Sequence, residues 1–411
     1  MQRFTSRLGP PAIVLILGAA AAPLSAWWPA DFDADSDVDL TDFSLFQNCF
    51  NGPNRPAPWP WCNDADLDDD TDVDLSDFSI FAACFNGPNR PPACEPEPAP
   101  ANMVLIPAGE FQMGDTFNEG NGDELPVHAV YVDAFYMDKY EVSNQQYADA
   151  LNWAYGQGGH IAVTSGGVYQ AGTGTSYPYC DTTTSNSYSR ITWDGGTFGV
   201  TTGKEDHPMV MVSWYGSVAY ANWRSAMEGK ALCYNLATWE CNFSASGYRL
   251  PTEAEWEKAA RGGVAGHRFP WSDSDTIQHA RANYYSYWPG GVLYYPYDTN
   301  PTSGFHPTFA VGDKPYTSPV GYFAPNGYGL YDMAGNVWEW CNDWYSSTYY
   351  STTPYPHVNP RGPTSGMYRV LRSGGWCGTA YHCRVANRIS YYSWPDSRDY
   401  GNGFRLVLVS P

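Results

Sequence analysis

Carboxylates and a tight turn come together in the stretch Gly329–Tyr345, whose sequence is GLYDMAGNVWEWCNDWY. Asp332 and Glu339 lie on either side of the turn at residues 334–336, and the residues after Gly335 alternate as in an extended strand. Backbone carbonyls of such a turn can face the same point as the two carboxylates. Since Ca²⁺ prefers oxygen ligands, the stretch predicts a calcium site. The alternative is an aromatic core strand with solvated carboxylates.

Aspartates with the spacing of a calcium loop recur in two copies near the N-terminus. The copies are DFDADSDVDLTD from Asp31 and DLDDDTDVDLSD from Asp66. A calcium loop carries side-chain ligands at its first, third, fifth, ninth and twelfth positions and a carbonyl at its seventh. Position six is Ser36 or Thr71, where glycine would ease the turn, and the alternative is an acidic, solvated linker. The predicted ligands are Asp31, Asp33, Asp35, Asp37, Asp39, Asp42, Asp66, Asp68, Asp70, Asp72, Asp74 and Asp77.

The repeated loops belong to a predicted small helical module at residues 27–94. Each loop leads into a short amphipathic helix, predicted at Phe43–Phe50 and Phe78–Phe85. Four cysteines also recur between the copies, and we favour Cys49–Cys62 and Cys84–Cys94 among the three pairings that four cysteines allow. The Pro-rich stretch 95–101 then marks a boundary to a large domain at 102–411.

Composition limits the compartment and the partners. The net charge of −21 argues against nucleic acid and against an anionic membrane surface as partners. Residues 1–26 are typical of a secretory signal peptide, and no other stretch is apolar enough for a membrane span. We therefore expect an exported protein that is secreted, periplasmic or on the cell surface. In such a compartment ten cysteines favour disulfides.

Two cysteines and many aromatic side chains crowd the C-terminal stretch 372–394. Cys377 and Cys383 would form a disulfide with each other, or with Cys341, Cys233 or Cys241, in an exported chain. Rigid aromatic rings interleaved with Asn and His are also typical of ligand-binding surfaces, although core and edge aromatics are the simpler interpretation. The predicted ligand-binding residues are Trp376, Tyr381, His382, Asn387, Tyr391, Tyr392 and Trp394.

Three helices are predicted in the large domain, which begins with a strand at about Asn102. Ser143 caps the first helix, which is expected to end near Trp153, and Ser213 caps the second, Trp214–Met227. Thr252 caps the third, which ends before Gly262. Residues 155–206 and 264–327 are rich in Gly, Ser, Thr, Tyr and Asn, and we expect long ordered loops and short strands there.

Several stretches of the large domain resemble one family. Besides Gly329–Tyr345, they are Met103–Gly114, His207–Trp214, Tyr248–Trp256, Arg369–Arg372 and Gly403–Arg405. In this order they resemble the formylglycine-generating, or sulfatase-modifying factor, family. The resemblance implies an α+β, loop-rich, C-type-lectin-like domain. The repeated calcium loops in turn resemble a dockerin or EF-hand-like module, which implies a protein partner for residues 27–94.

The resemblance also implies cofactors and an activity. The family's oxidase converts a cysteine of a sulfatase peptide to formylglycine with O2 and holds Cu(I) between two cysteines, which here would be Cys377 and Cys383. Their spacing is one residue longer than in the family. The alternative is a non-catalytic, lectin-like module that binds a glycan or protein ligand on its aromatic C-terminal face.

Structural Ca²⁺ is implied as well, at two sites in the large domain. Asp332 and Glu339 would give side chains to the first site, with the carbonyls of Gly335 and Val337. The second site would use Asn283 and the carbonyl of Tyr284, and the nearest further carboxylate is Asp313.

Overall fold

The computed structural model describes residues 30–32, 38–50, 62, 65, 67, 73, 75–85, 100–352, 357–390 and 393–409. The expected signal peptide at 1–26 and most of the Pro-rich linker lie outside the described residues. So do several residues with predicted roles, which are Asp33, Asp35, Asp37, Asp66, Asp68, Asp70, Asp72, Asp74, Cys94, Tyr391 and Tyr392.

Two short helices form the N-terminal module, α1 (Leu40–Cys49) and α2 (Leu75–Cys84). Each begins three residues before the predicted start, because the helix already forms within the last positions of the aspartate loop. In the first copy the carboxylate of Asp39 accepts a hydrogen bond from the Thr41 amide at 2.6 Å and caps α1.

The last aspartate of each loop ties the helix to the start of the loop. Asp42 Oδ1 accepts from the Phe32 amide at 2.7 Å, and Asp77 Oδ1 accepts from the Leu67 amide at 2.5 Å. Both carboxylates are fully buried. The two copies therefore share the same local structure, as their sequence register predicts.

Phenylalanine rings and disulfides hold the module together. The rings of Phe46 and Phe81 stack with centroids 5.3 Å apart, which joins α1 to α2. The predicted Cys49–Cys62 disulfide is confirmed. Cys84 is also disulfide-bonded, and its partner lies outside the described residues.

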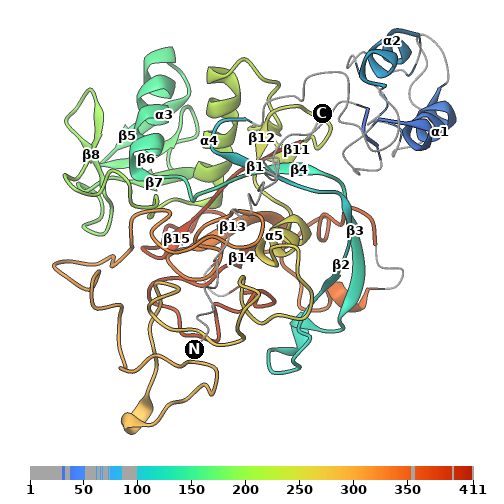
Figure 1. Cartoon of the computed structure of the whole chain (residues 1–411). Helices are drawn as coiled ribbons and strands as arrows, with labels where there is room; N and C mark the ends of the chain where they lie inside the picture. The colour runs from blue at the N-terminus through green and yellow to red at the C-terminus, as the bar shows by residue number, and fades with distance from the viewer. Residues whose placement is uncertain are drawn as a thin grey trace, which may run out of the picture.

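A four-stranded antiparallel sheet joins the beginning and the end of the large domain. Its order is β1 (Met103–Ile106), β4 (Phe135–Asp138), β16 (Val407–Val409) and β12 (Tyr248–Arg249). The strand predicted at the start of the domain is thus confirmed as β1. A separate ribbon, β2 (Gly109–Met113) with β3 (His128–Val132), extends from this sheet (Figure 1).

The three predicted helices of the large domain are present as α3 (Asn144–Gln157), α4 (Trp214–Met227) and α5 (Glu253–Ala260). Their caps are confirmed, since Ser143, Ser213 and Thr252 each accept a hydrogen bond from the backbone amide three residues ahead. Helix α3 runs beyond the predicted end near Trp153 and passes through Gly156. It ends at Gly158, whose φ is +71°. Helices α3 and α4 lie side by side at one end of the domain (Figure 1).

Short strands and loops make up most of the remaining chain. Residues 155–206 form three small strand pairings from β5 (Ile161–Thr164), β6 (Gly167–Gln170), β7 (Pro178–Asp181), β8 (Ile191–Trp193) and β9 (Phe198–Val200). A hairpin of β10 (Tyr234–Asn235) and β11 (Glu240–Cys241) follows α4. Residues 264–327, all of them described, contain only the 3-10 turn η3 (Pro289–Gly291) besides isolated bridges. No helix among the described residues is long and apolar enough to cross a membrane.

The stretch around Glu339 forms the central strand of a second sheet. Strand β13 (Trp338–Trp344) pairs with β14 (Arg369–Arg372) on one side and β15 (Asn402–Gly403) on the other. Glu339 has no exposed surface. The alternative of an aromatic core strand with solvated carboxylates is therefore wrong about the carboxylate of Glu339. The fold is a mixed, loop-rich α+β arrangement, as predicted.

Candidate functional site

Helix α5 carries three buried glutamates, and each of them binds arginine. Glu255 receives both terminal nitrogens of Arg249 at 2.7 and 2.6 Å, and Glu253 receives Arg388 at 2.7 and 2.6 Å. Glu257 accepts from Arg261 on the next turn and from Arg372 in β14. Buried charges of this kind are tolerated only where they are paired. The glutamates therefore fix α5 against the C-terminal part of the chain.

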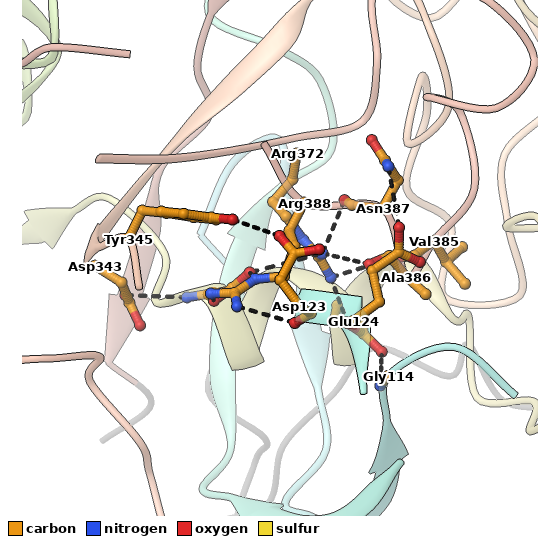
Figure 2. A network of polar contacts seen from close by, with 12 residues as sticks. Gly114, Asp123, Glu124, Asp343, Tyr345, Arg372, Val385, Ala386, Asn387 and Arg388 are labelled. Carbon is orange, nitrogen blue, oxygen red and sulfur yellow. Dashed lines mark hydrogen bonds and ion pairs between the residues drawn. The ribbon is translucent and has the colours of Figure 1, made fainter. Parts of the chain in front are cut away.

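The loop that carries the two predicted catalytic cysteines is held by arginines at both ends. At its start, the Arg372 guanidinium donates to the carbonyls of Val385, Ala386 and Asn387. At its end, Arg384 makes a two-point ion pair with Glu124 at 2.7 and 2.8 Å. Figure 2 shows Arg372 and Glu124 close to Val385, Ala386 and Asn387. The loop of residues 373–388 is thus closed on itself by side-chain to backbone bonds.

Cys377 and Cys383 are both free thiols. Cys377 is partly buried, and a Cβ on Gly401 would lie 3.4 Å from its Sγ. Cys383 has no exposed surface and packs among apolar side chains that include Phe269, Tyr284 and Ala334. The expected disulfide between the two is absent.

Burial sets the protonation of both thiols. Burial, together with the Asp399 carboxylate, raises the pKa of Cys377 to about 12. Burial, with smaller effects of Asp298 and of Cys377 itself, raises the pKa of Cys383 as well. Both are neutral thiols at neutral pH in the absence of a metal.

The other cysteines of the large domain are free too. Cys180, Cys233, Cys241 and Cys341 are unpaired, so disulfides are absent from the described part of this domain and our expectation from the cysteine count is wrong there. Cys341 and Cys383 each lie in a hydrophobic cluster with no other cysteine, whereas Cys180, Cys233 and Cys241 belong to one cluster without being bonded to one another.

Aromatic rings surround the loop next to Cys377. The Trp376 ring lies 5.5 Å from Phe305, 5.3 Å from Tyr316 and 5.4 Å from Tyr400, centroid to centroid. The Lys314 ammonium lies 5.9 Å from the Trp376 ring. Trp376 itself is fully buried and donates its Nε1 hydrogen to the Tyr400 carbonyl at 3.1 Å. It supports the partly exposed rings of Phe305, Tyr316 and Tyr400 around it.

The structure divides the predicted ligand-binding residues into two groups. Trp376 and Asn387 are buried, and the Asn387 amide donates to Glu124 at 3.2 Å. Tyr381 and His382 are partly exposed, and Trp394 is 39 % exposed. Burial and the nearby Arg384 lower the pKa of His382 to about 4, so it is neutral and accepts from the Thr379 amide.

Both carboxylates of the first predicted calcium site are buried. Asp332 accepts from the Gly321 amide through Oδ2 at 2.6 Å, and its buried Oδ1 has no hydrogen-bond partner. Glu339 accepts from Arg405 at 2.7 and 2.8 Å and from the Trp256 indole at 2.8 Å. A third carboxylate, Glu141, accepts from Asn336 at 2.6 Å. Sequence reasoning missed Glu141, whose only signal is its place before the Ser143 cap.

Charge in this cluster fits a divalent cation. Burial raises the pKa of Asp332 to about 6, and burial with the Asp332 and Glu339 charges raises the pKa of Glu141 well above its ordinary value. Ionised, the three carboxylates outnumber Arg405 by two charges, which Ca²⁺ would balance. Side chains alone do not form a metal site in the described residues, so the Gly335 and Val337 carbonyls would be needed.

Gly335 is the residue that the turn requires. Its φ is +83°, and a Cβ there would lie 2.4 Å from the Asn283 carbonyl oxygen. That carbonyl accepts from the Asn336 amide at 2.8 Å, which places the second predicted site beside the first.

The second predicted calcium site has fewer free oxygens. The Tyr284 carbonyl accepts from His279 Nε2 at 3.1 Å, and the Asn283 amide nitrogen donates to the Tyr316 carbonyl at 2.8 Å. Asp313 is exposed. Of the aspartates in the N-terminal loops, Asp31, Asp39, Asp42 and Asp77 are described, and they are too few to define a calcium geometry.

Arginines are the functional residues that sequence reasoning did not assign. Arg388, Arg384 and Arg372 position the cysteine loop, and their partners come from α5 and the acidic loop of residues 115–124. The available signal was the run Glu-x-Glu-x-Glu in α5, whose other residues are three alanines, Trp256 and Lys258.

Comparison with known proteins agrees with this architecture. The family model of the sulfatase-modifying factor enzyme 1-like domain matches residues 90–409. A formylglycine-generating enzyme of Streptomyces coelicolor is 35 % identical over 340 residues, which covers 77 % of this chain and 94 % of that protein. The enzyme of the same name from Thermomonospora curvata is 34 % identical, covering 77 % of this chain and 96 % of that protein.

More distant relatives differ in name. A bovine protein called inactive C-alpha-formylglycine-generating enzyme 2 is 30 % identical, covering 74 % of this chain and 87 % of its own length. Among solved structures, PvdO from Pseudomonas aeruginosa is 25 % identical with a TM-score of 0.48, covering 75 % of this chain and 94 % of that one. The chain belongs to the sulfatase-modifying factor, or formylglycine-generating enzyme, family.

Proposed function

We propose that the large domain is an O2-dependent oxidase that converts a peptidyl cysteine of a sulfatase to formylglycine. The observation that carries the proposal is the pair of free thiols, Cys377 and Cys383, in one loop. A relative that is 35 % identical over most of the chain bears the name of this activity. The partly exposed aromatic surface beside Cys377 offers a place for a peptide.

Two soft thiolates are the donors that Cu(I) prefers, so Cys377 and Cys383 fit this ion. When bound there, Cu(I) would supply the chemistry of O2. The overall reaction balances with a thiol reductant: one peptidyl cysteine, one O2 and two reductant thiols give the aldehyde, hydrogen sulfide, water and one reductant disulfide. The rigid loop of residues 373–388 holds both sulfurs in place, and burial excludes bulk water from Cys383.

The test is aldehyde formation on a peptide containing Cys-x-Pro-x-Arg, with the full chain, Cu(I), O2 and a thiol reductant. We expect capture of the product by a hydrazine probe, and loss of the product in Cys377→Ser and in Cys383→Ser. Cys241→Ser, which removes a thiol elsewhere in the domain, is the matched control and should keep the activity. No aldehyde from a folded, copper-supplemented protein would refute the proposal.

A second function is favoured by the burial of Cys383. Because this sulfur has no exposed surface and lies in an apolar cluster, a copper ion would have to enter a closed core. The alternative is a lectin-like module that binds a glycan or protein without turnover, through Tyr381, His382 and Trp394. A chain that binds ligand but forms no aldehyde would support it.

Three further assignments accompany this proposal. Export to the cell surface, periplasm or medium rests on the N-terminal sequence. A dockerin-like role for residues 27–94, with calcium and a protein partner, rests on the aspartate repeat and on the matching Asp42 and Asp77 contacts. Structural calcium at Asp332, Gly335, Val337 and Glu339, and at Asn283 and Tyr284, rests on the carboxylate cluster described above. Calcium titration of the separate loop variants Asp42→Ala and Asp332→Ala would test both modules.

A further inference from the structure

Cys383 is buried, although the proposed oxidase needs its sulfur as a metal ligand. Its side chain has no exposed surface and lies in an apolar cluster with Phe269 and Tyr284, whereas Cys377 in the same loop is partly exposed. An ion that binds both sulfurs therefore reaches Cys383 only when the chain opens locally.

The strap of residues 379–383, which carries this thiol, is held at both ends. Before it, the Gly378 carbonyl accepts from the Tyr285 amide at 2.8 Å. After it, the Arg384 guanidinium reaches the acidic loop of residues 115–124. Release of one end would let the strap move and expose the thiol.

Two rings of the strap also contact the surrounding domain. Tyr381 lies 6.0 Å from Tyr295, and His382 lies 5.4 Å from Trp338, centroid to centroid. Ring contacts of this kind are weaker than a buried ion pair, whose loss leaves a charge unpaired. The contact that closes the strap most firmly is therefore the one made by Arg384.

The partner of Arg384 is Glu124, which has no exposed surface. Its two oxygens accept from the terminal nitrogens of Arg384 at 2.7 and 2.8 Å, and Asn387 donates to Oε1 at 3.2 Å. A second carboxylate, Asp115, lies 3.7 Å from Arg384 and accepts from amides of its own loop. Glu124 is thus the main counter-charge of Arg384.

Arg384 connects Glu124 to the strap. Its Nε donates to the Tyr381 carbonyl at 3.0 Å, and its guanidinium lies 4.2 Å from the centre of the Tyr381 ring. Arg384 also directly follows Cys383 in the chain. A guanidinium that is fixed by Glu124 therefore fixes both the backbone and a ring of the strap.

We propose that Glu124 is the positioning residue that keeps Cys383 buried, and that release of its ion pair with Arg384 opens the strap and admits a soft metal ion to this sulfur. Metal entry rests on the proposed oxidase, whereas the closure itself does not. Glu124 acts on Cys383 indirectly, through Arg384.

The first test measures the closure without copper or substrate. Glu124→Gln keeps the size of the side chain and removes its charge. We expect hydrogen exchange in residues 379–384 and alkylation of Cys383 at pH 9 to become roughly tenfold faster or more, because a charge-assisted hydrogen bond is lost. Cys341, which is equally buried in another cluster, should keep its wild-type rate.

The matched control is Glu255→Gln. Glu255 makes the same kind of buried two-point contact, with Arg249 at 2.7 and 2.6 Å, and neither residue belongs to the cysteine loop. This variant should leave the ratio of Cys383 to Cys341 labelling at its wild-type value. Equal acceleration of both thiols in Glu124→Gln would mean general destabilisation and would overturn the proposal.

Tyr381→Leu covers the case in which Glu124→Gln does not fold. It removes the ring that lies on Arg384 and leaves the buried ion pair in place, so it should also speed up the labelling of Cys383 selectively. An unchanged rate in this variant would contradict the connection from Arg384 to the strap.

The second test follows metal entry. Transfer of Cu(I) from its bicinchoninate complex is read from the loss of the colour of that complex. Glu124→Gln should take up copper faster than wild type, and Cys383→Ser should lose the uptake. Equal uptake rates in wild type and Glu124→Gln would overturn the role of the strap in metal entry. Selective opening of the strap without copper uptake would instead refute the oxidase and support the closure by Glu124.

Discussion

The carboxylate of Glu339 and the guanidinium of Arg405 form a two-point ion pair at 2.7 and 2.8 Å with neither side chain exposed. Glu339 comes from the central strand β13, and Arg405 precedes the last strand β16. The Arg405 guanidinium also donates to the carbonyls of Asp138, Lys139 and Tyr331. This pair therefore links the sheet of β13 to the chain that leads into β16 of the four-stranded sheet.

We expect Arg405→Met to destabilise the protein by about 3–5 kcal/mol, because it leaves the Glu339 charge buried and unpaired. The measurement is equilibrium unfolding by denaturant. Arg281→Met is the matched control: Arg281 makes the same two-point contact with Asp273, but on the surface. It should cost no more than about 1 kcal/mol. An equal loss in the free energy of unfolding from the two substitutions would show that burial does not make the Glu339–Arg405 pair more important for stability than the exposed pair.

Calcium should stabilise the large domain through the cluster of Glu141, Asp332 and Glu339. Binding to the folded state alone adds about 2.7 kcal/mol at a hundred times Kd, so the thermal midpoint should rise with calcium and fall with chelator. The N-terminal loops would also respond, and Asp332→Ala separates the two effects. In that variant the calcium-dependent shift of the large-domain transition should disappear. A shift that persists in Asp332→Ala would place the responsible ion elsewhere.

His207 should make the free energy of unfolding depend on pH. Burial, then the nearby Lys204 charge, lowers the pKa of His207 from 6.5 to about 4, and its Nδ1 lies 2.9 Å from Thr317 Oγ1. On acidification the unfolded chain takes up the proton first. The free energy of unfolding is therefore unaffected by His207 above pH 6.5. As the pH falls from 6.5 toward 4, protonation of this histidine in the unfolded chain lowers the free energy of unfolding by roughly 1 kcal/mol per pH unit.

The measurement is the free energy of unfolding between these pH values for wild type and His207→Gln. The variant should show a shallower slope, because its side chain does not titrate. His160→Gln, at an exposed site, is the control and should follow wild type. Parallel slopes for wild type and His207→Gln would mean that carboxylates alone account for the acid sensitivity.

The loop thiols should resist alkylation in the metal-free protein. With a pKa of about 12, Cys377 is ionised to about one part in ten thousand at pH 8. Cys383 is also fully buried and should react more slowly still. Timed labelling with iodoacetamide followed by peptide mass spectrometry gives both rates, with the denatured chain as reference. Fast labelling of Cys383 would show that the loop opens in solution.

Much of the fold could be predicted from local sequence signals. The caps Ser143, Ser213 and Thr252 act through backbone amides three residues away, so they can be recognised without tertiary information. The loop character of residues 264–327 also followed from composition. The end of α3 was harder to predict, because the helix continues until Gly158 and no earlier residue forces it to stop.

The site was predicted less completely, because its contacts join distant parts of the chain. Asp332, Gly335 and Glu339 share one stretch and were found together, whereas Glu141 and Arg405 come from opposite ends of the domain. The strap shows the same limit: Cys383 was singled out for its thiol, but Glu124 belongs to a loop far away in sequence. Spacing along the chain cannot reveal such pairs.

The strand order of the first sheet constrains how this protein can be made. Strand β16 lies between β4 and β12, so the last residues of the domain fill a gap between strands that are synthesised much earlier. Until β16 has left the ribosome, β4 and β12 each keep an open edge. The domain therefore completes its folding only after β16 has been synthesised, and a nascent chain that lacks β16 would depend on chaperones to shield those edges.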